Sequence, residues 1–404
     1  MKAIVFHGVG DIRLDSVSDP KIQEPADAIV RLTASAICGT DLHFVRGTVP
    51  GMVPGTILGH EGVGIVEEVG KDVRNFKPGD RVVLTSTIAC GSCSYCRAGY
   101  QSQCDKANPN GPQAGTSFFG GPKQTGPFQG LQAERARIPF ANVGMVRLPD
   151  EVTDDQAILL SDIAPTGYFG ADLAEITPGD TVAVFGCGPV GLFALVSARL
   201  LGAGRIIAID TIASRLEMAR DQGAEIIDFN GEHPVEALHR LTGGIGVDRA
   251  IDAVGVDASQ PASGPAAPSR DERKQFQQEI EKIESEGRSL SKEWNPGDAP
   301  SQVFCWAVQG LAKAGTFSII GVYPPSFTSF PMGLAMNRNL TIKAGNCNHR
   351  RYVQKLVDWT RNGTMDPLRI LTQRQPMTSA LEAYKTFAQH RPGWVKVELE
   401  PSKL

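Results

Sequence analysis

The spacing of hydrophobic and polar residues changes after Asp162. Before that point, short β-branched runs alternate with Gly and Pro turns, as in IVRLTASAICG, GIVEEVGKDV and KPGDRVVL. Such runs, bounded by turn residues, predict a compact β-rich domain. A long Gly- and Pro-rich loop follows at 107–130, and loops of that length usually serve a site.

Beyond Asp162, apolar runs alternate with helical patterns. The runs TVAVFG, RIIAID, EIIDF and DRAIDAVG are separated by helix-forming stretches such as 190–201 and 214–222. This alternation predicts a doubly wound parallel sheet with helices on its faces. A helix near 306–313 and a strand at 315–322 continue the pattern.

One stretch interrupts that alternation. Between 256 and 302, Pro-rich flanks enclose a charged helical run at 273–290. Because Pro cannot donate to the ladder of a central strand, we expect a surface insertion here.

Chain length and these patterns together predict an α/β protein in three segments. A chain of 404 residues exceeds the usual ceiling for one hydrophobic core. We expect a β-rich domain at 1–163 and a parallel-sheet domain at 164–324. The remaining segment, 325–404, is expected to return to the first domain, whose own stretch is too short to close a β core.

Composition narrows the functional classes. Apolar residues make up 41% and charged residues 21%, which is typical of a soluble globular protein. A formal net charge of -4 argues against nucleic acid as a partner. The N-terminus has the pattern of a first strand and lacks the features of an export signal. The most apolar stretch, 186–201, is too short to cross a bilayer. We therefore expect a cytoplasmic protein with no membrane partner.

A glycine motif follows the first strand of the parallel-sheet segment. Gly186, Gly188 and Gly191 form G-x-G-x-x-G between the strand TVAVF and a helix. Such glycines permit a tight turn and a close approach of backbone to pyrophosphate, and the helix N-terminus favours the phosphates. The alternative is a glycine turn that serves only helix packing.

An acidic residue extends this motif. Asp210 closes the second strand, where its carboxylate can accept hydrogen bonds from the ribose of NAD and would repel the 2′-phosphate of NADP. Arg215 could contact ribose or phosphate, or be a solvated helix residue. The expected cofactor-binding residues are Gly186, Gly188, Pro189, Val190, Gly191, Asp210 and Arg215.

Half of the eight cysteines crowd into one lobe at about 88–106. These are Cys90, Cys93, Cys96 and Cys104. Four thiolates at this spacing can close a tetrahedron around zinc with no open position, which predicts a structural site. An iron–sulfur cluster is the alternative, although the spacing departs from ferredoxin runs.

A second set of metal-binding residue types is dispersed. The segment CGTDLH places Cys38, Thr40, Asp41 and His43 in one turn, and GHEGVGIVEEVGKDV contributes His60 and Glu61. Each residue alone is unremarkable, because lone Cys and His residues usually belong to a core or a surface. Their conjunction is hard to obtain by chance.

With these motifs, the sequence resembles the zinc-containing medium-chain dehydrogenases/reductases. The pattern GHE-x-x-G-x5-G-x-x-V is matched in full, ending at Val73, and the likeness covers nearly the whole chain apart from 256–302. The resemblance implies a GroES-like β-rich catalytic domain interrupted by a Rossmann domain. It also implies two Zn²⁺ ions per chain, NAD, and a homodimer or homotetramer. The expected reaction interconverts an alcohol, or an aldehyde hydrate such as that of formaldehyde, and its carbonyl product.

Site residues carry over from the resemblance one by one. It implies a catalytic zinc held by Cys38, His60 and a third protein ligand. We expect Asp162, in SDIAPTGYFGAD, because that motif is similar to glutathione-independent formaldehyde dehydrogenases. Glu61 is the alternative, as in polyol dehydrogenases of the family, and otherwise lies behind the zinc.

Three neighbouring residues have expected supporting roles. Thr40 and His43 would relay the proton to solvent, with a surface position as the alternative for His43. Asp41 either orients His60 or satisfies local backbone.

The sequence departs from the family pattern at a residue that contacts the cofactor pyrophosphate in many relatives. Many relatives carry a basic residue just after the first zinc ligand, where this chain has Gly39. Lys396 and Arg391 are candidates to replace it, or are solvated. A non-catalytic, quinone-reductase-like nucleotide-binding protein is the competing functional class, and the three expected zinc ligands argue against it.

Overall fold

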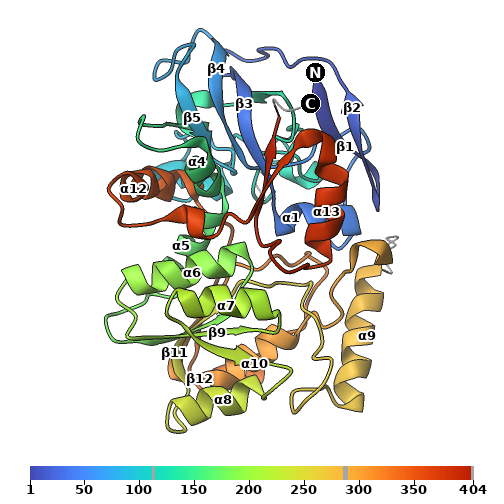
Figure 1. Cartoon of the computed structure of the whole chain (residues 1–404), viewed down its shortest axis with the longest axis vertical. Coiled ribbons are helices and arrows are strands. Elements are labelled where there is room, and N and C mark those ends of the chain that lie inside the picture. Colours follow the sequence, from blue (N-terminus) through green and yellow to red (C-terminus); the bar gives the residue numbers. More distant parts are fainter. Residues whose placement is uncertain (112–113, 285–289, 402–404) are drawn as a thin grey trace. The chain divides into compact units, whose positions relative to one another are not determined.

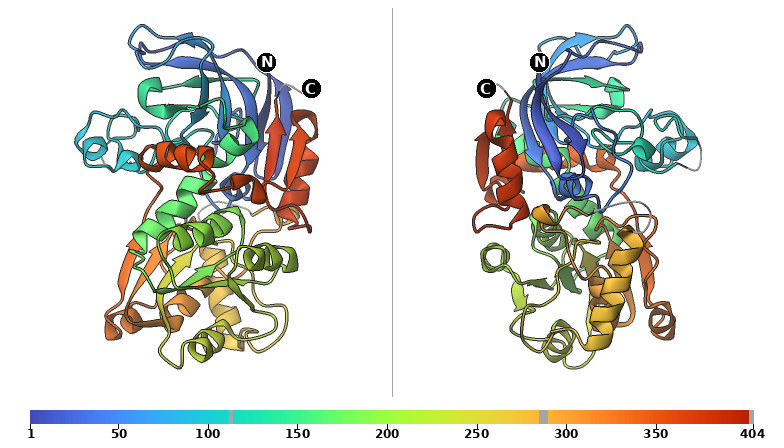
Figure 2. Two further views of the ribbon diagram at one scale, coloured as in Figure 1. Left: turned by 60° about the vertical axis from the view of Figure 1, so that its left-hand side comes forward. Right: turned by 90° about the vertical axis from the view of Figure 1, so that its right-hand side faces the viewer.

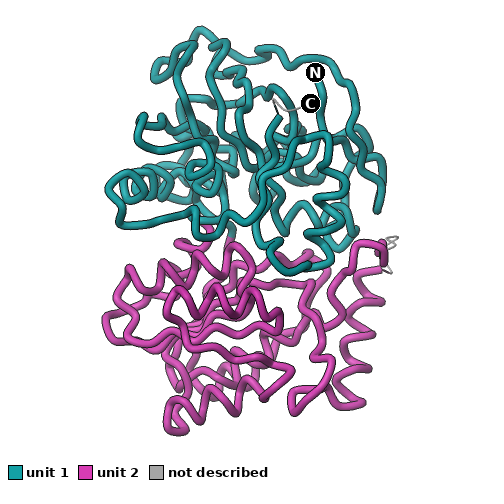
Figure 3. The backbone as a smooth tube through the Cα atoms, viewed as in Figure 1, with its two compact units in different colours: residues 1–165, 346–404 teal, residues 166–345 magenta. Residues whose placement is uncertain are grey.

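The structure is a computed structural model that describes residues 1–111, 114–284 and 290–401. It divides into two compact units: unit 1 is Met1–Pro165 with Asn346–Leu404, and unit 2 is Thr166–Gly345 (Figure 3). The return to the first unit was expected at 325 and occurs at Asn346. The reason is that β13 (Thr341–Ala344) still pairs in parallel with β12 (Leu311–Ile319) of unit 2.

Unit 1 is built on a mainly antiparallel sheet, which confirms the predicted β-rich domain (Figure 1). In spatial order its strands are β14 (Gln373–Pro376), β15 (Val397–Glu400), β3 (Ala28–Ile37), β4 (Gly62–Val69), β5 (Arg81–Leu84) and β7 (Met145–Arg147), with β6 (Arg135–Ile138) beside β3. A separate antiparallel pair is formed by β1 (Lys2–Gly8) and β2 (Asp11–Ser16). Two strands of the sheet, β14 and β15, come from the returning segment, which therefore completes the β core.

Helices lie around this sheet and in the lobe that holds the four cysteines. They are α1 (Gly39–Arg46), α2 (Ser94–Arg97), α3 (Ala141–Gly144), α4 (Asp154–Ser161), α12 (His349–Arg361) and α13 (Ala380–Ala388). Thr153 begins α4 with a capping box, in which its side chain accepts from the backbone of Gln156 and the Gln156 side chain accepts in return. Residues 163–173 form α5 (Ile163–Leu173), and the boundary between the units falls within it.

Unit 2 contains the predicted parallel sheet. Its strands are β8 (Thr181–Phe185), β9 (Arg205–Asp210), β10 (Glu225–Asp228), β11 (Val247–Asp252), β12 and β13. They lie in the order β10-β9-β8-β11-β12-β13, and every pairing between them is parallel. Counted from β8, this is the order 3-2-1-4-5-6 of the Rossmann fold, so the predicted fold class is confirmed.

Four of the described helices of unit 2 pack on this sheet as two pairs (Figures 1 and 2). The first pair is α6 (Pro189–Leu200) and α7 (Ala213–Asp221), and the second is α8 (Pro234–Leu241) and α10 (Gln302–Gly310). The helix expected near 306–313 ends at Gly310, because Leu311 is extended and pairs with Val247 of β11. A short helix, α11 (Met332–Asn337), precedes β13.

The insertion at 256–302 contains one long helix, α9 (Arg270–Glu284), shown in gold in Figure 2. Its apolar side buries Phe276 and Ile283. The expected helical run extended to 290, and 285–289 lie outside the described residues. Within the described part of the chain, helices are too short or too polar to cross a bilayer.

Candidate active site

The end of strand β3 places Cys38. The strand stops at Ile37, and Cys38 has an extended backbone that begins helix α1. The backbone N–H of Cys38 donates to Oδ2 of Asp41 at 2.9 Å, and the two residues form a reciprocal capping box. The thiol is therefore fixed where a strand turns into a helix.

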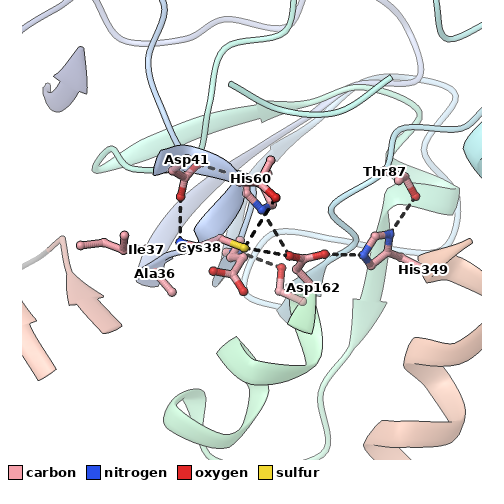
Figure 4. Close-up of polar contacts among 12 residues, drawn as sticks. Ala36, Ile37, Cys38, Asp41, His60, Thr87, Asp162 and His349 are labelled. Atoms are coloured by element: carbon pink, nitrogen blue, oxygen red, sulfur yellow. Dashed lines mark hydrogen bonds and ion pairs between the residues drawn. The ribbon is translucent and has the colours of Figure 1, made fainter. Parts of the chain in front are cut away.

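Two residues far apart in the sequence complete a compact group with this thiol. Oδ2 of Asp162 lies 3.5 Å from Sγ of Cys38 and 3.2 Å from Nε2 of His60 (Figure 4). One potential ligand atom from each residue lies within 4.8 Å of the others, and all three residues are buried. We call Cys38, His60 and Asp162 the Cys–His–Asp group. All three were expected from the sequence.

Contacts with the sheet position Asp162, and a contact with helix α1 positions His60. Ser161, next to Asp162, accepts from the backbone N–H of Gly62 at 3.0 Å and donates to the carbonyl of Leu84 at 2.6 Å. These bonds attach the end of α4 to β4 and β5. On the other side, Nδ1 of His60 lies 3.2 Å from Oδ1 of Asp41. This contact supports the orienting role that sequence analysis weighed for Asp41.

Burial and neighbouring charges set the protonation of the Cys–His–Asp group. Burial, and then the Asp162 carboxylate, raises the pKa of the Cys38 thiol. Burial also opposes ionisation of Asp162, but hydrogen bonds from His349 and His60 hold the pKa of its carboxyl well below the usual range. A thiol and an ionised carboxylate therefore face each other in a buried site. One sulfur, one imidazole nitrogen and one carboxylate oxygen are the donor types that zinc takes, so the residues fit this metal.

Glu61 does not belong to the Cys–His–Asp group. Its carboxylate forms an ion pair with Nζ of Lys396, which also donates to the carbonyl of Ile37 at 3.1 Å. Burial would lower the pKa of Lys396, but the adjacent Glu61 carboxylate raises it, so the ammonium stays protonated. Both side chains are fully buried. Lys396, weighed in sequence analysis as a phosphate ligand, is thus engaged by Glu61.

Two residues beside the Cys–His–Asp group were not expected from the sequence. Nε2 of His349 lies 2.7 Å from Oδ1 of Asp162, and its Nδ1 lies 3.2 Å from Oγ1 of Thr87 (Figure 4). His349 begins α12, 187 positions after Asp162. A signal existed in the polar segment NCNHR, which directly follows the last parallel strand, but no spacing rule connects it to Asp162.

The two expected relay residues lie on α1. The hydroxyl of Thr40 is 3.9 Å from Sγ of Cys38. His43 is buried, and its Nδ1 lies 3.3 Å from Oγ1 of Thr48. His43 is therefore a buried residue and not the surface residue of the alternative interpretation. Its place in a relay remains a prediction.

The four-cysteine lobe forms a second candidate metal centre. Ligand atoms of Cys90, Cys93, Cys96 and Cys104 lie within 4.8 Å of one another. Backbone amides turn toward the sulfurs: those of Ser92 and Cys93 each lie 3.4 Å from Sγ of Cys90. Although burial acts in the opposite direction, hydrogen bonds from Ser92 lower the pKa of Cys90 to about 6. Amides directed at a thiolate suit a closed zinc site.

The turn after β8 has the form that a dinucleotide pyrophosphate requires. Gly186 has a φ of +88°, which favours glycine. A Cβ on Gly191 would collide with the carbonyl oxygen of Gly186, so the helix packs closely on the turn. A Cβ on Gly188 would meet, within 4 Å in the described chain, only Nη1 of Arg215 at 3.9 Å. The backbone at Gly188, which begins α6, is therefore open to a ligand.

Asp210 closes β9 beside this turn. Its Oδ2 accepts from the backbone of Cys187 at 2.7 Å, and its Oδ1 accepts from Thr211 and Ile212 at 2.7 and 2.9 Å. These bonds fix the carboxylate at the carboxyl end of the sheet next to the glycine turn. Arg215, on α7, directs its guanidinium toward Gly188. Pro189 and Val190 form the first turn of α6.

Comparisons with known proteins identify the family of this chain. The sequence model for an alcohol dehydrogenase GroES-like domain matches residues 24–150, and that for a zinc-binding dehydrogenase matches residues 189–264. A zinc-type alcohol dehydrogenase-like protein of Bacillus subtilis is 36% identical over 99% of this chain and 100% of its own. A glutathione-independent formaldehyde dehydrogenase of Pseudomonas aeruginosa is 39% identical over 64% of this chain and 66% of its own.

Solved structures of dehydrogenases are also similar to this chain. An alcohol dehydrogenase from Thermus sp. ATN1 superposes with a TM-score of 0.80 at 32% identity, covering 99% of both chains. A zinc-binding dehydrogenase from Sinorhizobium meliloti, bound to NADP, superposes with a TM-score of 0.74 at 25% identity, again covering 99% of both chains.

Proposed function

This chain belongs to the zinc-containing medium-chain dehydrogenases/reductases and is an alcohol oxidoreductase, and we propose that it transfers hydride from an alcohol or an aldehyde hydrate to NAD. The observation that carries the proposal is the convergence of one thiol, one imidazole and one carboxylate in the Cys–His–Asp group. A glycine turn with an adjacent acidic residue in unit 2 supports a dinucleotide cofactor.

Residues of unit 1 have two proposed roles at the substrate oxygen: some bind a metal ion and others position those ligands. A zinc ion held by Sγ of Cys38, Nε2 of His60 and Oδ2 of Asp162 would supply a Lewis acid that favours loss of the alcohol proton. Asp41 holds His60 from behind, at Nδ1. Lys396 holds Glu61 in an ion pair, which supports Asp162 over Glu61 as the third ligand and disfavours the polyol-dehydrogenase alternative.

The proton would leave through α1. Thr40 presents a hydroxyl beside Cys38, at the start of the helix, and can accept the alcohol proton as it donates its own. His43, one turn further on, can accept that proton at an imidazole nitrogen. Their common position on one helix turn supports the proposed relay.

The partly exposed aromatic ring of Phe118 adjoins one of the proposed metal ligands. The ring of Phe118 meets that of His60 edge-on, with centroids 6.2 Å apart, and stacks on Phe44 at 5.8 Å. Such a ring suits the carbon side of a small alcohol better than a polyol, each of whose hydroxyls would lose hydrogen bonds to water there. Because one relative is a glutathione-independent formaldehyde dehydrogenase, we include an aldehyde hydrate among the proposed substrates.

The acidic residue at the end of β9 is proposed to select NAD over NADP. Asp210 offers a carboxylate where the ribose hydroxyls of NAD would donate, and a 2′-phosphate would meet a like charge. Replacing Asp210 by Gly should lower the ratio of kcat/KM for NAD to that for NADP about 10-fold or more, a change of about 1.4 kcal/mol. Steady-state rates with the two cofactors measure it.

Asp228 offers a matched control for this prediction. It ends the neighbouring strand β10 in register with Asp210, and its carboxylate accepts from Thr211 and Asn230. The Asp228→Asn variant should keep the wild-type cofactor ratio. An unchanged ratio in Asp210→Gly would show that Asp210 does not select the cofactor.

A substrate panel tests the proposed function itself. The purified protein is incubated with NAD and, in turn, methanol, ethanol, benzyl alcohol, 2-propanol, sorbitol and formaldehyde, and NADH absorbance is followed. We expect NADH formation with a primary alcohol or with formaldehyde, and its loss after removal of zinc by a chelator. Turnover of sorbitol alone would favour the polyol alternative. NADH binding without turnover of any alcohol would favour a non-catalytic nucleotide-binding protein.

A further inference from the structure

His349 and Thr87 have no place in the proposed function so far, yet both are buried beside the Cys–His–Asp group. His349 makes its contact with Asp162 from the side opposite the other two ligands (Figure 4). Oδ1 of Asp162 faces Nε2 of His349 at 2.7 Å, whereas Oδ2 faces Cys38 and His60. The two oxygens of one carboxylate thus have different partners.

The hydrogens of this contact follow from the donor and acceptor types. An ionised carboxylate only accepts, so Nε2 of His349 carries the hydrogen and donates to Asp162. The hydroxyl of Thr87 can then donate to Nδ1 at 3.2 Å. Thr87 therefore fixes both the orientation and the tautomer of the imidazole.

Asn348 anchors this arrangement to the fold. Its Oδ1 accepts from the backbone N–H and the hydroxyl of Ser102, at 3.0 and 2.9 Å. Ser102 lies between Cys96 and Cys104 in the four-cysteine lobe. The start of α12 is therefore bound to the lobe on one side and to Asp162 on the other, which makes His349 a rigid support.

We propose that His349 is a positioning residue that holds Oδ1 of Asp162 and leaves only Oδ2 to bind a metal ion. This inference rests on the proposed function. A carboxylate bound through one oxygen fills one coordination position, whereas one bound through both fills two. A tetrahedral zinc with three protein ligands must keep its fourth position for substrate. By withholding Oδ1, His349 preserves that position.

Cobalt substitution tests this role without reliance on turnover. Co²⁺ replaces zinc at such sites, and its visible absorption is strong in a four-coordinate site and weak in a five-coordinate one. The wild-type chain should give the strong spectrum. In His349→Phe, which cannot donate, Oδ1 of Asp162 loses its hydrogen bond from the imidazole and can approach the metal, so the absorption should fall. Zinc affinity at the same site, measured by chelator competition, should fall about 10- to 100-fold.

Two further variants separate positioning from a general effect on the fold. His349→Gln retains an N–H donor and should restore most of the absorption and affinity. His7→Phe removes another imidazole–carboxylate contact of 2.7 Å in unit 1, between His7 and Asp15, and should change neither. Zinc retained in the four-cysteine lobe, and a cooperative melting transition, show that each variant is folded.

The possible outcomes distinguish failure of the positioning role of His349 from failure of the proposed function. A strong wild-type spectrum that persists unchanged in folded His349→Phe, with unchanged zinc affinity, would overturn the positioning role alone. The same loss in His349→Gln as in His349→Phe would also overturn it, because the donor would not be what matters. A wild-type chain that takes up cobalt in the lobe and not at the Cys–His–Asp group would overturn the proposed function together with this role.

Discussion

Replacing Asp162 by Ala should reduce kcat/KM by about 1,000-fold or more and leave NADH binding intact. The substitution removes one of three proposed zinc ligands and leaves His60 and Cys38 without the oxygen that faces them at 3.2 and 3.5 Å. Lewis-acid stabilisation is worth several kcal/mol, and about 4 kcal/mol corresponds to three powers of ten in rate. Turnover is measured with the best substrate of the panel, and NADH binding by fluorescence titration.

Glu61 provides the critical comparison for this prediction. If Glu61 were the third ligand, Asp162→Ala would remain active and Glu61→Gln would lose its zinc. The ion pair of Glu61 with Lys396 leads to the opposite expectation. Undiminished activity in Asp162→Ala would therefore contradict the ligand set proposed for this chain.

Replacing Cys104 by Ser should lower Tm by about 6–12 °C. Cys104 is buried in the four-cysteine lobe, and its sulfur lies 3.9 Å from that of Cys93. Loss of a structural zinc removes binding energy that is available only to the folded state. A loss of about 3 kcal/mol gives this shift at the ~2–4 °C per kcal/mol found for domains of 150–250 residues. Calorimetry and zinc content are measured on the same sample.

Cys305 supplies a control for the loss of a thiol. It is a partly buried cysteine on α10, outside both metal-binding groups of the described chain. Cys305→Ser should keep the wild-type zinc content and shift Tm by less than about 2 °C. An unshifted Tm with full zinc content in Cys104→Ser would remove the structural role from the lobe.

The site residues that the sequence predicted well are those whose roles depend on their spacing from near neighbours in the chain. In the glycine turn, the requirement for glycine arises from a positive φ at Gly186 and from close packing at Gly191, which neighbours in sequence impose. The four cysteines were also recognisable, because they lie close together in the sequence and can reach one metal ion within one short lobe. Strands β8, β9 and β11 of the parallel sheet were also clear, because they are largely buried apolar runs bounded by turn residues.

Contacts between distant segments were not accessible from the sequence. His349 meets Asp162 across 187 positions, and Lys396 meets Glu61 across 335. Neither partner has a spacing that marks it, and a lone His or Lys is usually solvated. The return at 325 was misplaced for a related reason: only the pairing of β13 with β12 shows that the parallel sheet continues to Ala344. The end of unit 2 is therefore set by pairing between two strands, which the local sequence pattern does not reveal.

The zinc content of the purified chain tests the central claim most directly. That claim is that Cys38, His60 and Asp162 hold a zinc ion distinct from the one in the four-cysteine lobe. After dialysis against a weak chelator, the wild type should retain two zinc ions per chain, matching the two groups found in the described residues. Asp162→Ala should retain one, and so should Cys104→Ser. A wild type with a single zinc, lost in Cys104→Ser and unaffected in Asp162→Ala, would contradict the account.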